Sequence, residues 1–315
     1  ADLVNSKIIG ISYEDVTDDA GRLPLLAPMS EKMTSWEFYK KRFLRILPPF
    51  FVFFVLYSTL PMAWGQIGWD TASKDLSRLL LNFPTLAGHF WFMYPLISIY
   101  LIIPVVSPWL RKATAAEERF FLLLFAISTC IPFLNRFCGE VWGQCFWNEY
   151  HMLWYFSGYL GYLVLAHYLT KYPLQWSWRK LSVVGLPMFL VGYAVTFGGY
   201  VVMQEFFPGN YAYLEIVWLF SGINVFMMTF PLFVAVQKMN VASSPMLSKV
   251  ASMTFGIYLC HFVIIQMGYD LYEYLFPAGT LPVVKIICNA LTTFAVSYLV
   301  VSLLSLTKMT RRLVA

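Results

Sequence analysis

Residues 182–203 read SVVGLPMFLVGYAVTFGGYVVM, a stretch without a single charged side chain. A helix of about 20 apolar residues spans the hydrocarbon core of a bilayer, so this stretch predicts a membrane-crossing helix. Comparable apolar stretches recur along the chain at 45–64, 88–110, 120–135, 150–169, 213–236, 250–268 and 282–306. The sequence therefore predicts about eight transmembrane helices.

The composition of the whole chain supports the same conclusion. It is 59% hydrophobic and 12% charged, whereas soluble domains contain roughly 45–50% apolar and 25% charged residues. Strand-like alternation is absent from the apolar stretches, so helices rather than a membrane barrel are expected to satisfy the backbone. We predict an all-α, polytopic integral membrane bundle, and we exclude a secreted protein or a single-anchor enzyme.

The N-terminal segment differs in kind from the rest of the chain. Residues 1–36 are polar and acidic and contain no apolar stretch long enough to span a bilayer. We expect this segment to lie on the cytoplasmic side, and residues 37–315 to form the transmembrane domain. The chain begins with Ala rather than Met, which indicates a processed, trimmed or incomplete N-terminus.

The distribution of basic residues predicts the orientation. With the N-terminal segment in the cytoplasm, only four of the 22 Lys and Arg residues face outward, namely Lys74, Arg78, Arg136 and Lys285. Positive residues are enriched on the cytoplasmic side of membrane proteins. Both ends of the chain are therefore expected to be cytoplasmic.

The five cysteines predict no metal site, because no CxxC or His/Cys spacing of the kind zinc requires is present. Cys138 and Cys145 lie in one short loop. They either pair, if the loop faces an oxidising compartment, or remain free thiols.

A basic motif precedes the first apolar stretch. Residues 38–50 read FYKKRFLRILPPF, and Arg42 and Arg45 are three residues apart, so they share a helix face. Two guanidinium groups in this position suit the phosphates of a nucleotide or of coenzyme A. The alternative is an anchor that follows the positive-inside rule, and the spacing leaves both interpretations open.

Histidines are the second set of candidate residues. His261 lies about eleven residues into its apolar stretch, near the bilayer midplane, where an ionisable group is expensive and either acts in chemistry or bonds to a neighbouring helix. His89, like Glu149 and His151, is predicted at an outer membrane boundary, where it either acts on a sugar hydroxyl or is an ordinary interfacial side chain.

We interpret His167 as a side chain that reaches toward the inner interface. Asn224, Lys285 and Asn289 are expected to bond between helices.

Three patches taken together resemble the membrane-bound acyltransferase family 3, whose members O-acylate surface glycans and other acceptors. They are residues 38–50, residues 89–104 (HFWFMYPLISIYLIIP) and residues 255–262 (FGIYLCHF). Their order and spacing fit the family over nearly the whole chain from residue 25. The His-Phe-Trp-Phe variant at residues 89–92 is similar to the branch of inner-membrane O-acetyltransferases.

The resemblance implies an acyl-CoA donor, acetyl-CoA in the O-acetyltransferase branch, on the cytoplasmic side, and a carbohydrate hydroxyl as acceptor. Arg42 and Arg45 match the Arg-x-x-Arg of the family, which implies a role with the donor, and His89 and His261 are the expected catalytic residues within this chain. The family usually has about ten spans, and the first carries an essential histidine. That span and the next are absent here, so the chain is either a truncated piece or a member without the usual base.

We therefore predict an O-acyltransferase of the bacterial inner membrane that acts on a glycan or a lipid-linked saccharide, contacts membrane lipid and uses neither metal nor nucleic acid. A first alternative is an exporter or flippase of a polysaccharide or lipid-linked intermediate, because proline-rich spans and midplane polar groups suit it equally well. A second is a membrane subunit that scaffolds a polysaccharide assembly complex.

Overall fold

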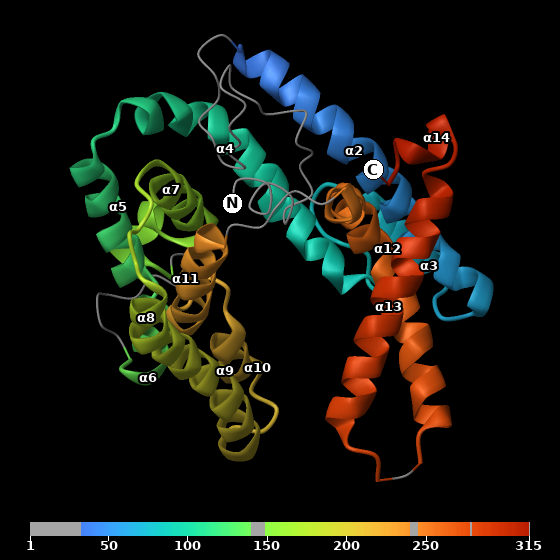
Figure 1. The fold of residues 1–315 in the computed structure, drawn as a ribbon. Helices are drawn as coiled ribbons and strands as arrows, with labels where there is room; N and C mark the ends of the chain where they lie inside the picture. Colours follow the sequence, from blue (N-terminus) through green and yellow to red (C-terminus); the bar gives the residue numbers. More distant parts are fainter. Residues whose placement is uncertain (1–32, 140–148, 240–244, 278, 315) are drawn as a thin grey trace. The chain divides into compact units, whose positions relative to one another are not determined.

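A computed structural model describes residues 33–139, 149–239, 245–277 and 279–314. All regular elements in these ranges are helices, which confirms the all-α fold (Figure 1). The described residues divide into two compact units. We call residues 33–104 together with 245–314 the terminal unit, and residues 105–239 the central unit.

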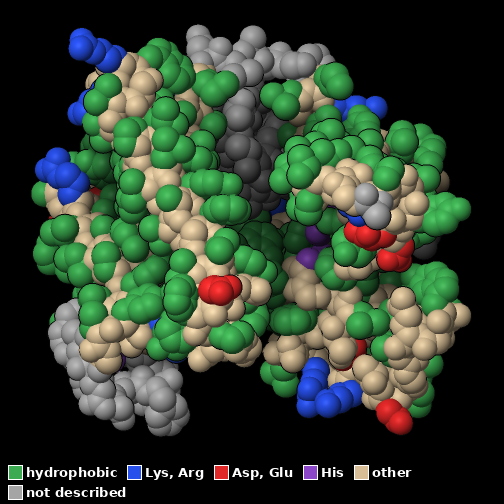
Figure 2. All heavy atoms as spheres, turned by 90° about the horizontal axis from the view of Figure 1, so that it is seen from below, with side chains coloured by type: hydrophobic (Ala, Val, Ile, Leu, Met, Phe, Trp, Pro, Cys, Tyr) green, Lys and Arg blue, Asp and Glu red, His purple; other side chains and the backbone are tan. Residues whose placement is uncertain are grey.

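Seven helical segments within the described ranges are long and apolar enough to cross a membrane, which makes the chain a multi-pass integral membrane protein. The side chains on its surface agree with this, because Figure 2 shows hydrophobic groups over most of one face and charged groups only in small clusters. The seven segments are Ser35–Trp64, Gly88–Lys112, Ala115–Phe137, Trp178–Phe206, Tyr211–Lys238, Lys249–Leu275 and Pro282–Leu304.

One expected span is built differently. Residues 150–169 are not a single helix but a 3-10 turn, η4 (His151–Phe156), an extended Ser157 and the helix α7 (Gly158–Lys171). The 14 residues of α7 cover only about 21 Å at the helical rise, against roughly 30 Å of hydrocarbon. The break occurs where Gly158 takes a positive φ of 68°, which apolar composition alone does not reveal.

In the terminal unit, helix α2 (Ser35–Thr59) begins ten residues before the predicted apolar span. A capping box fixes its start: Thr34 Oγ1 accepts from the Glu37 main-chain N–H at 3.2 Å, and the Glu37 carboxylate accepts from the Thr34 N–H at 2.8 Å. The basic motif is therefore part of the helix rather than a loop before it. The 3-10 turn η2 (Leu60–Trp64) and the short helix α3 (Trp69–Ser77) follow.

The C-terminal part of this unit is a hairpin of two long antiparallel helices, α12 (Pro245–Leu275) and α13 (Pro282–Leu304), which lie side by side in Figure 1. Polar side chains join them as predicted: Asn289 Nδ2 donates to the Ile265 carbonyl at 3.2 Å, and Lys285 Nζ lies 3.0 Å from the Glu273 carboxylate. A last short helix, α14 (Lys308–Arg311), follows.

The central unit packs short and long helices around α5 and α9. Helices α9 and α11 lie side by side, and Asn224 joins them as predicted, since its Nδ2 donates to Thr196 Oγ1 at 2.9 Å. Its elements after α4 are α5 (Ala115–Ser128), α6 (Ile131–Phe137), η4, α7, α8 (Trp178–Lys180), a π-turn η5 (Leu181–Gly185), α9 (Leu186–Phe206), α10 (Tyr211–Glu215), η6 (Ile216–Trp218) and α11 (Ile223–Lys238).

A buried charged cluster holds α5 and α7 together. The Glu118 side chain is fully buried, and its carboxylate lies 2.9 Å from His167 Nδ1 and 2.9 Å from Lys171 Nζ. Lys171 Nζ also donates to the Ala113 carbonyl at 2.9 Å, near the end of α4 (Met93–Lys112). The prediction that His167 reaches toward the interface is therefore wrong, because its imidazole is bonded inside the protein.

We expect Glu118→Ala to lower the free energy of unfolding by about 1–3 kcal/mol, because it leaves the buried His167 imidazole and the partly exposed Lys171 ammonium without their carboxylate partner. Equilibrium unfolding in mixed micelles measures this loss. Glu205→Ala removes an exposed carboxylate of α9 and is the control, with an expected change within about 0.5 kcal/mol. Equal effects of the two substitutions would contradict a stabilising role of the cluster.

Close packing of α5 on α7 also depends on Gly161. A Cβ at this position would overlap the ring of Phe125, which is itself fully buried. Gly198, within α9, has open space around the corresponding position.

We expect Gly161→Ala to destabilise the protein by about 1–3 kcal/mol through overpacking. The matched variant Gly198→Ala should be neutral or stabilising by up to about 1 kcal/mol, because alanine is the better helix former. Thermal unfolding of both variants in the same detergent separates the two effects. A neutral Gly161→Ala would show that α5 and α7 do not pack as closely as described.

Candidate functional site

His89 lies in the 3-10 turn η3 (Gly88–Phe92), which leads into α4. The turn is anchored because the Phe90 side chain within it and the Met93 side chain directly after it are fully buried. It is also tied to α12, since the Tyr258 hydroxyl donates to the His89 main-chain carbonyl at 2.6 Å. His89, which lies in a short turn rather than a long helix, is therefore held in a fixed position against α12.

Aromatic rings surround the His89 imidazole. It stacks on Phe262, with ring centroids 4.7 Å apart and an interplanar angle of 18°. Edge contacts follow from Phe90 at 4.8 Å, Tyr57 of α2 at 5.1 Å and Tyr258 at 5.7 Å. Residues from three separate segments therefore build one aromatic cage around this imidazole.

The His261 ring lies beside it. The two imidazole centroids are 5.1 Å apart at an interplanar angle of 77°, so the structure brings together the two predicted catalytic residues, which we call the histidine pair. His261 Nδ1 lies 2.6 Å from the Tyr258 carbonyl, to which it can only donate. A neutral imidazole bonded in this way keeps its lone pair on Nε2, the nitrogen that can accept a proton.

The His89 ring nitrogens have no hydrogen bond to any described residue, although both are buried. The Leu259 carbonyl lies near the ring and accepts from the Tyr57 hydroxyl at 2.9 Å. A buried polar group without a partner costs about 1–3 kcal/mol. Such a cost points to a ligand group that completes the site.

The loop before η3 is itself built on polar contacts. The buried Asp75 of α3 accepts from the Thr85 N–H at 2.9 Å and from the Thr85 hydroxyl at 2.8 Å. The Tyr94 hydroxyl lies 2.5 Å from the Asn82 carbonyl. These contacts fix the segment that delivers His89 to the cage.

Arg42 and Arg45, the arginine pair, lie on α2 and are half-buried, whereas the adjacent Lys40 and Lys41 are exposed. The Arg42 guanidinium lies over the Phe38 ring at 5.5 Å and near the Tyr100 ring of α4 at 5.8 Å. An arginine that only anchored the helix in lipid headgroups would not need such packing. The structure therefore distinguishes the arginine pair from the neighbouring lysines.

Helix α2 connects the two sites within the terminal unit. Arg45 precedes Tyr57, the α2 residue of the cage, by twelve residues, which corresponds to about 18 Å along a helix axis. Between them the buried face carries Phe50 and Phe54, which contact Phe90. Helix α2 thus carries the arginine pair near its start and contributes Tyr57 to the cage around His89 near its end.

A family model described as an acyltransferase domain matches residues 25–302. The chain belongs to the acyltransferase-3 family. The resemblance inferred from the three motifs is thereby confirmed, and the chain is a membrane acyltransferase that transfers groups other than aminoacyl groups. No curated protein and no solved structure matches it.

The remaining predicted residues of this acyltransferase lie in the central unit. His151 Nε2 lies 3.1 Å from Asn135 Oδ1, and Asn135 Nδ2 donates to the Glu149 carbonyl at 2.9 Å. His151 also has a positive φ of 47°, unusual for a residue other than glycine. This group belongs to a different unit from the histidine pair.

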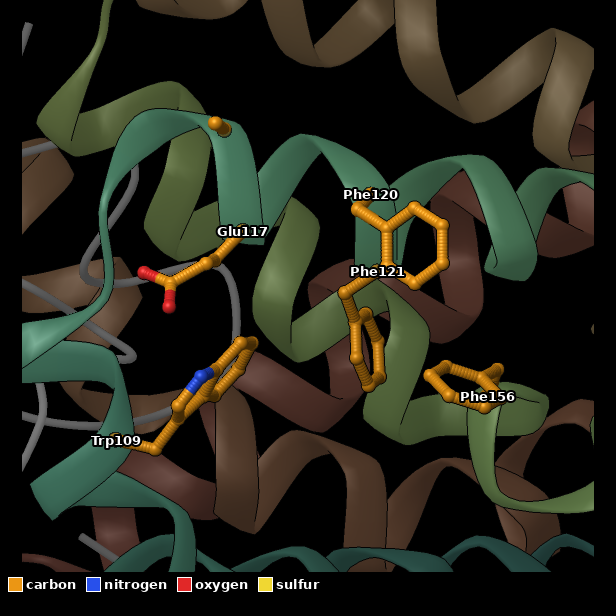
Figure 3. A pocket seen from close by; sticks show the side chains of 6 residues that line it. Trp109, Glu117, Phe120, Phe121 and Phe156 are labelled. Atoms are coloured by element: carbon orange, nitrogen blue, oxygen red, sulfur yellow. The ribbon is translucent and has the colours of Figure 1, made fainter.

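An apolar groove of about 560 Å³ also lies in the central unit of the acyltransferase. Figure 3 shows the rings of Trp109, Phe121 and Phe156 following one another along it, with centroid separations of 5.6 and 5.1 Å. Its Glu117 carboxylate caps α5 through Thr114, at 2.7 Å from the main-chain nitrogen. The groove contains none of the predicted site residues, so we do not assign the transfer reaction to it.

Within the described ranges, no group of three His, Cys, Asp or Glu side chains is placed to hold a metal ion. Cys138 is exposed. Its predicted partner Cys145 lies outside the described residues, as does most of the N-terminal segment 1–36.

Sequence reasoning missed the two tyrosines of the acyltransferase site. Tyr258 lies inside the FGIYLCHF motif, three residues before His261, and this helical spacing was the available signal. Tyr57 continues the series Phe50, Phe54, Tyr57, whose steps of four and three residues place all three side chains on one helix face. The interhelical contact that makes either of them part of the site is not visible in the sequence.

We expect His89→Phe to abolish acyl transfer while leaving the thermal unfolding midpoint unchanged or raised. Phenylalanine keeps the aromatic contacts and removes two buried nitrogens without partners. His167→Phe is the control: it should lower stability by about 1–3 kcal/mol, because this imidazole is bonded to Glu118. Comparable destabilisation by both substitutions would contradict the unpartnered state of His89.

Proposed function

We propose that this acyltransferase is a bacterial inner-membrane O-acetyltransferase. It transfers the acyl group of acetyl-CoA, or of another acyl-CoA, to a hydroxyl of a surface glycan or a lipid-linked saccharide. The proposal extends the family assignment by naming the donor, the acceptor class and the membrane.

The arginine pair supports the choice of donor. Two half-buried guanidinium groups of one helix face offer paired donors for phosphate oxygens. The distribution of basic residues supports a cytoplasmic position for this end of α2, on the side where acyl-CoA is available. Coenzyme A carries its phosphates at one end and its thioester at the end of a flexible arm, so a donor held at the arginines can extend along α2.

The histidine pair supports the place of transfer. The acceptor oxygen attacks the thioester carbonyl carbon, a C–O bond forms, the C–S bond breaks, and the thiolate leaves and takes up a proton. In the family pattern a histidine of the first span is the base. Within this chain, His261 Nε2 is the nitrogen placed to accept or pass on the hydroxyl proton, and an N–H of His89 is placed to donate to the developing oxyanion.

A single observation carries the proposal. Helix α2 carries the two arginines and, about 18 Å further along its axis, contacts the ring of His89, beside which the ring of His261 lies. A donor that has phosphates at one end and a reactive carbonyl at the other matches this arrangement.

The donor assignment predicts the effect of removing the arginine pair. In membranes with the protein expressed from its complete gene, Arg42→Ala/Arg45→Ala should raise the KM for acetyl-CoA by roughly tenfold or more, because charge-assisted bonds to the phosphates are lost. The measurement is transfer of radiolabel from acetyl-CoA to polysaccharide. Lys40→Ala/Lys41→Ala removes the same formal charge from exposed neighbours and should change KM by less than about threefold.

Equal effects of the two double variants would contradict a specific phosphate site at the arginines. Failure of the unsubstituted protein to label polysaccharide, against a working positive control, would contradict the donor and acceptor assignment. Movement of an unmodified saccharide across the membrane in that case would favour the exporter.

A further inference from the structure

Tyr258 contacts both members of the histidine pair through different atoms. Its hydroxyl donates to the His89 main-chain carbonyl at 2.6 Å, and its own main-chain carbonyl accepts from His261 Nδ1, also at 2.6 Å. Its ring also lies beside both imidazoles, with centroids 5.7 Å from His89 and 5.9 Å from His261. One residue of α12 therefore bonds to two histidines that lie 172 positions apart in the sequence.

The two bonds fix different properties of the site. The hydroxyl bond holds the start of η3 against α12 and so sets the position of the His89 ring relative to His261. The carbonyl bond requires a proton on His261 Nδ1 and so leaves Nε2 as the accepting nitrogen. Separation and tautomer are the two properties that a proton-transferring pair needs to have fixed before the substrate binds.

Neighbouring tyrosines of the terminal unit make simpler contacts. The Tyr57 hydroxyl bonds to the Leu259 carbonyl, and the Tyr39 hydroxyl bonds to the Leu101 carbonyl at 2.9 Å. Those bonds join helices without touching a polar atom of either histidine. The two contacts of Tyr258 therefore do more than join two helices, because they also fix both histidines.

We propose that Tyr258 is a positioning residue for acyl transfer, which holds His89 in place through its hydroxyl and sets the tautomer of His261 through its carbonyl. The inference rests on the proposed function, in which the histidine pair is the transfer centre. Tyr258 acts through the histidines and is not itself assigned a contact with the substrate.

Tyr258→Phe tests the hydroxyl contact, because it removes one oxygen and keeps the ring and the main-chain carbonyl. In the full-length protein we expect kcat for acetyl transfer to fall roughly tenfold to a hundredfold, as small misplacements of reacting groups do. The KM for acetyl-CoA should stay within about threefold, because the arginine pair lies about 18 Å along α2 from the cage.

Tyr272→Phe is the matched control. It lies on the same helix, its hydroxyl bonds to Thr292 Oγ1 at the same distance of 2.6 Å, and it is about 21 Å along α12 from Tyr258. Both substitutions remove one hydroxyl bond, so comparable thermal unfolding midpoints are expected. Only Tyr258→Phe should reduce kcat.

The rate of chemical modification of the His89 ring tests the same contact without measuring activity. The chain has four histidines, and carbethoxylation by diethyl pyrocarbonate can be mapped to each by mass spectrometry. Tyr258→Phe should raise the rate at His89 at least roughly threefold by releasing η3, with no change at His167, and Tyr272→Phe should leave both rates unchanged. Nitrogen-15 NMR of histidine-labelled, unsubstituted protein tests the second contact, and should show His261 protonated on Nδ1.

Wild-type kcat and an unchanged His89 rate in Tyr258→Phe would overturn the positioning role, as would an Nε2-protonated His261. If the unsubstituted protein transfers no acetyl group, the proposed function fails. The modification rates and the tautomer then still decide whether Tyr258 holds the two histidines.

Discussion

Lipid offers no hydrogen-bond partner, so each polar group within the membrane-spanning segments has to find its partner inside the protein. Most do so here: Glu118 is held between His167 and Lys171, and Asn224 Nδ2 bonds across to Thr196. Single buried oxygens of Ser58, Asn224 and Ser297 lack a hydrogen bond to the described residues, and His89 differs from them because both of its ring nitrogens lack one. Satisfied polar groups hold helices together, and we propose that the unpartnered His89 ring is completed by substrate.

Helix α2 gives the terminal unit its functional layout. Its first turns carry the arginine pair beside Phe38, and its other end supplies Tyr57 to the cage around His89. The turn η3 and helix α12 complete that cage, and the Tyr258 hydroxyl joins the two. In the proposed function, this layout lets a long donor be recognised at its charged end and react at its other end, with α2 fixing the separation between the two positions.

Much of this fold followed from the sequence, because apolar length alone predicts a membrane helix. The exceptions are local. Apolar composition at 150–169 does not reveal the break at Gly158. The shared face of Arg42 and Arg45 predicts helix before residue 45, but the apolar stretch does not show that the helix begins at Ser35, after the capping residue Thr34. His89 and His261 were predicted as separate residues. Their 5.1 Å juxtaposition depends on how η3 meets α12, a contact that no pattern within either segment encodes.

The most direct test of this account is a cryo-EM structure of the full-length protein with a non-reactive acyl-CoA analogue. We expect its phosphates to contact Arg42 and Arg45 and its acyl group to lie beside His89 and His261. An analogue bound in the groove of Trp109 and Phe121, or with its acyl group away from both histidines, would contradict it.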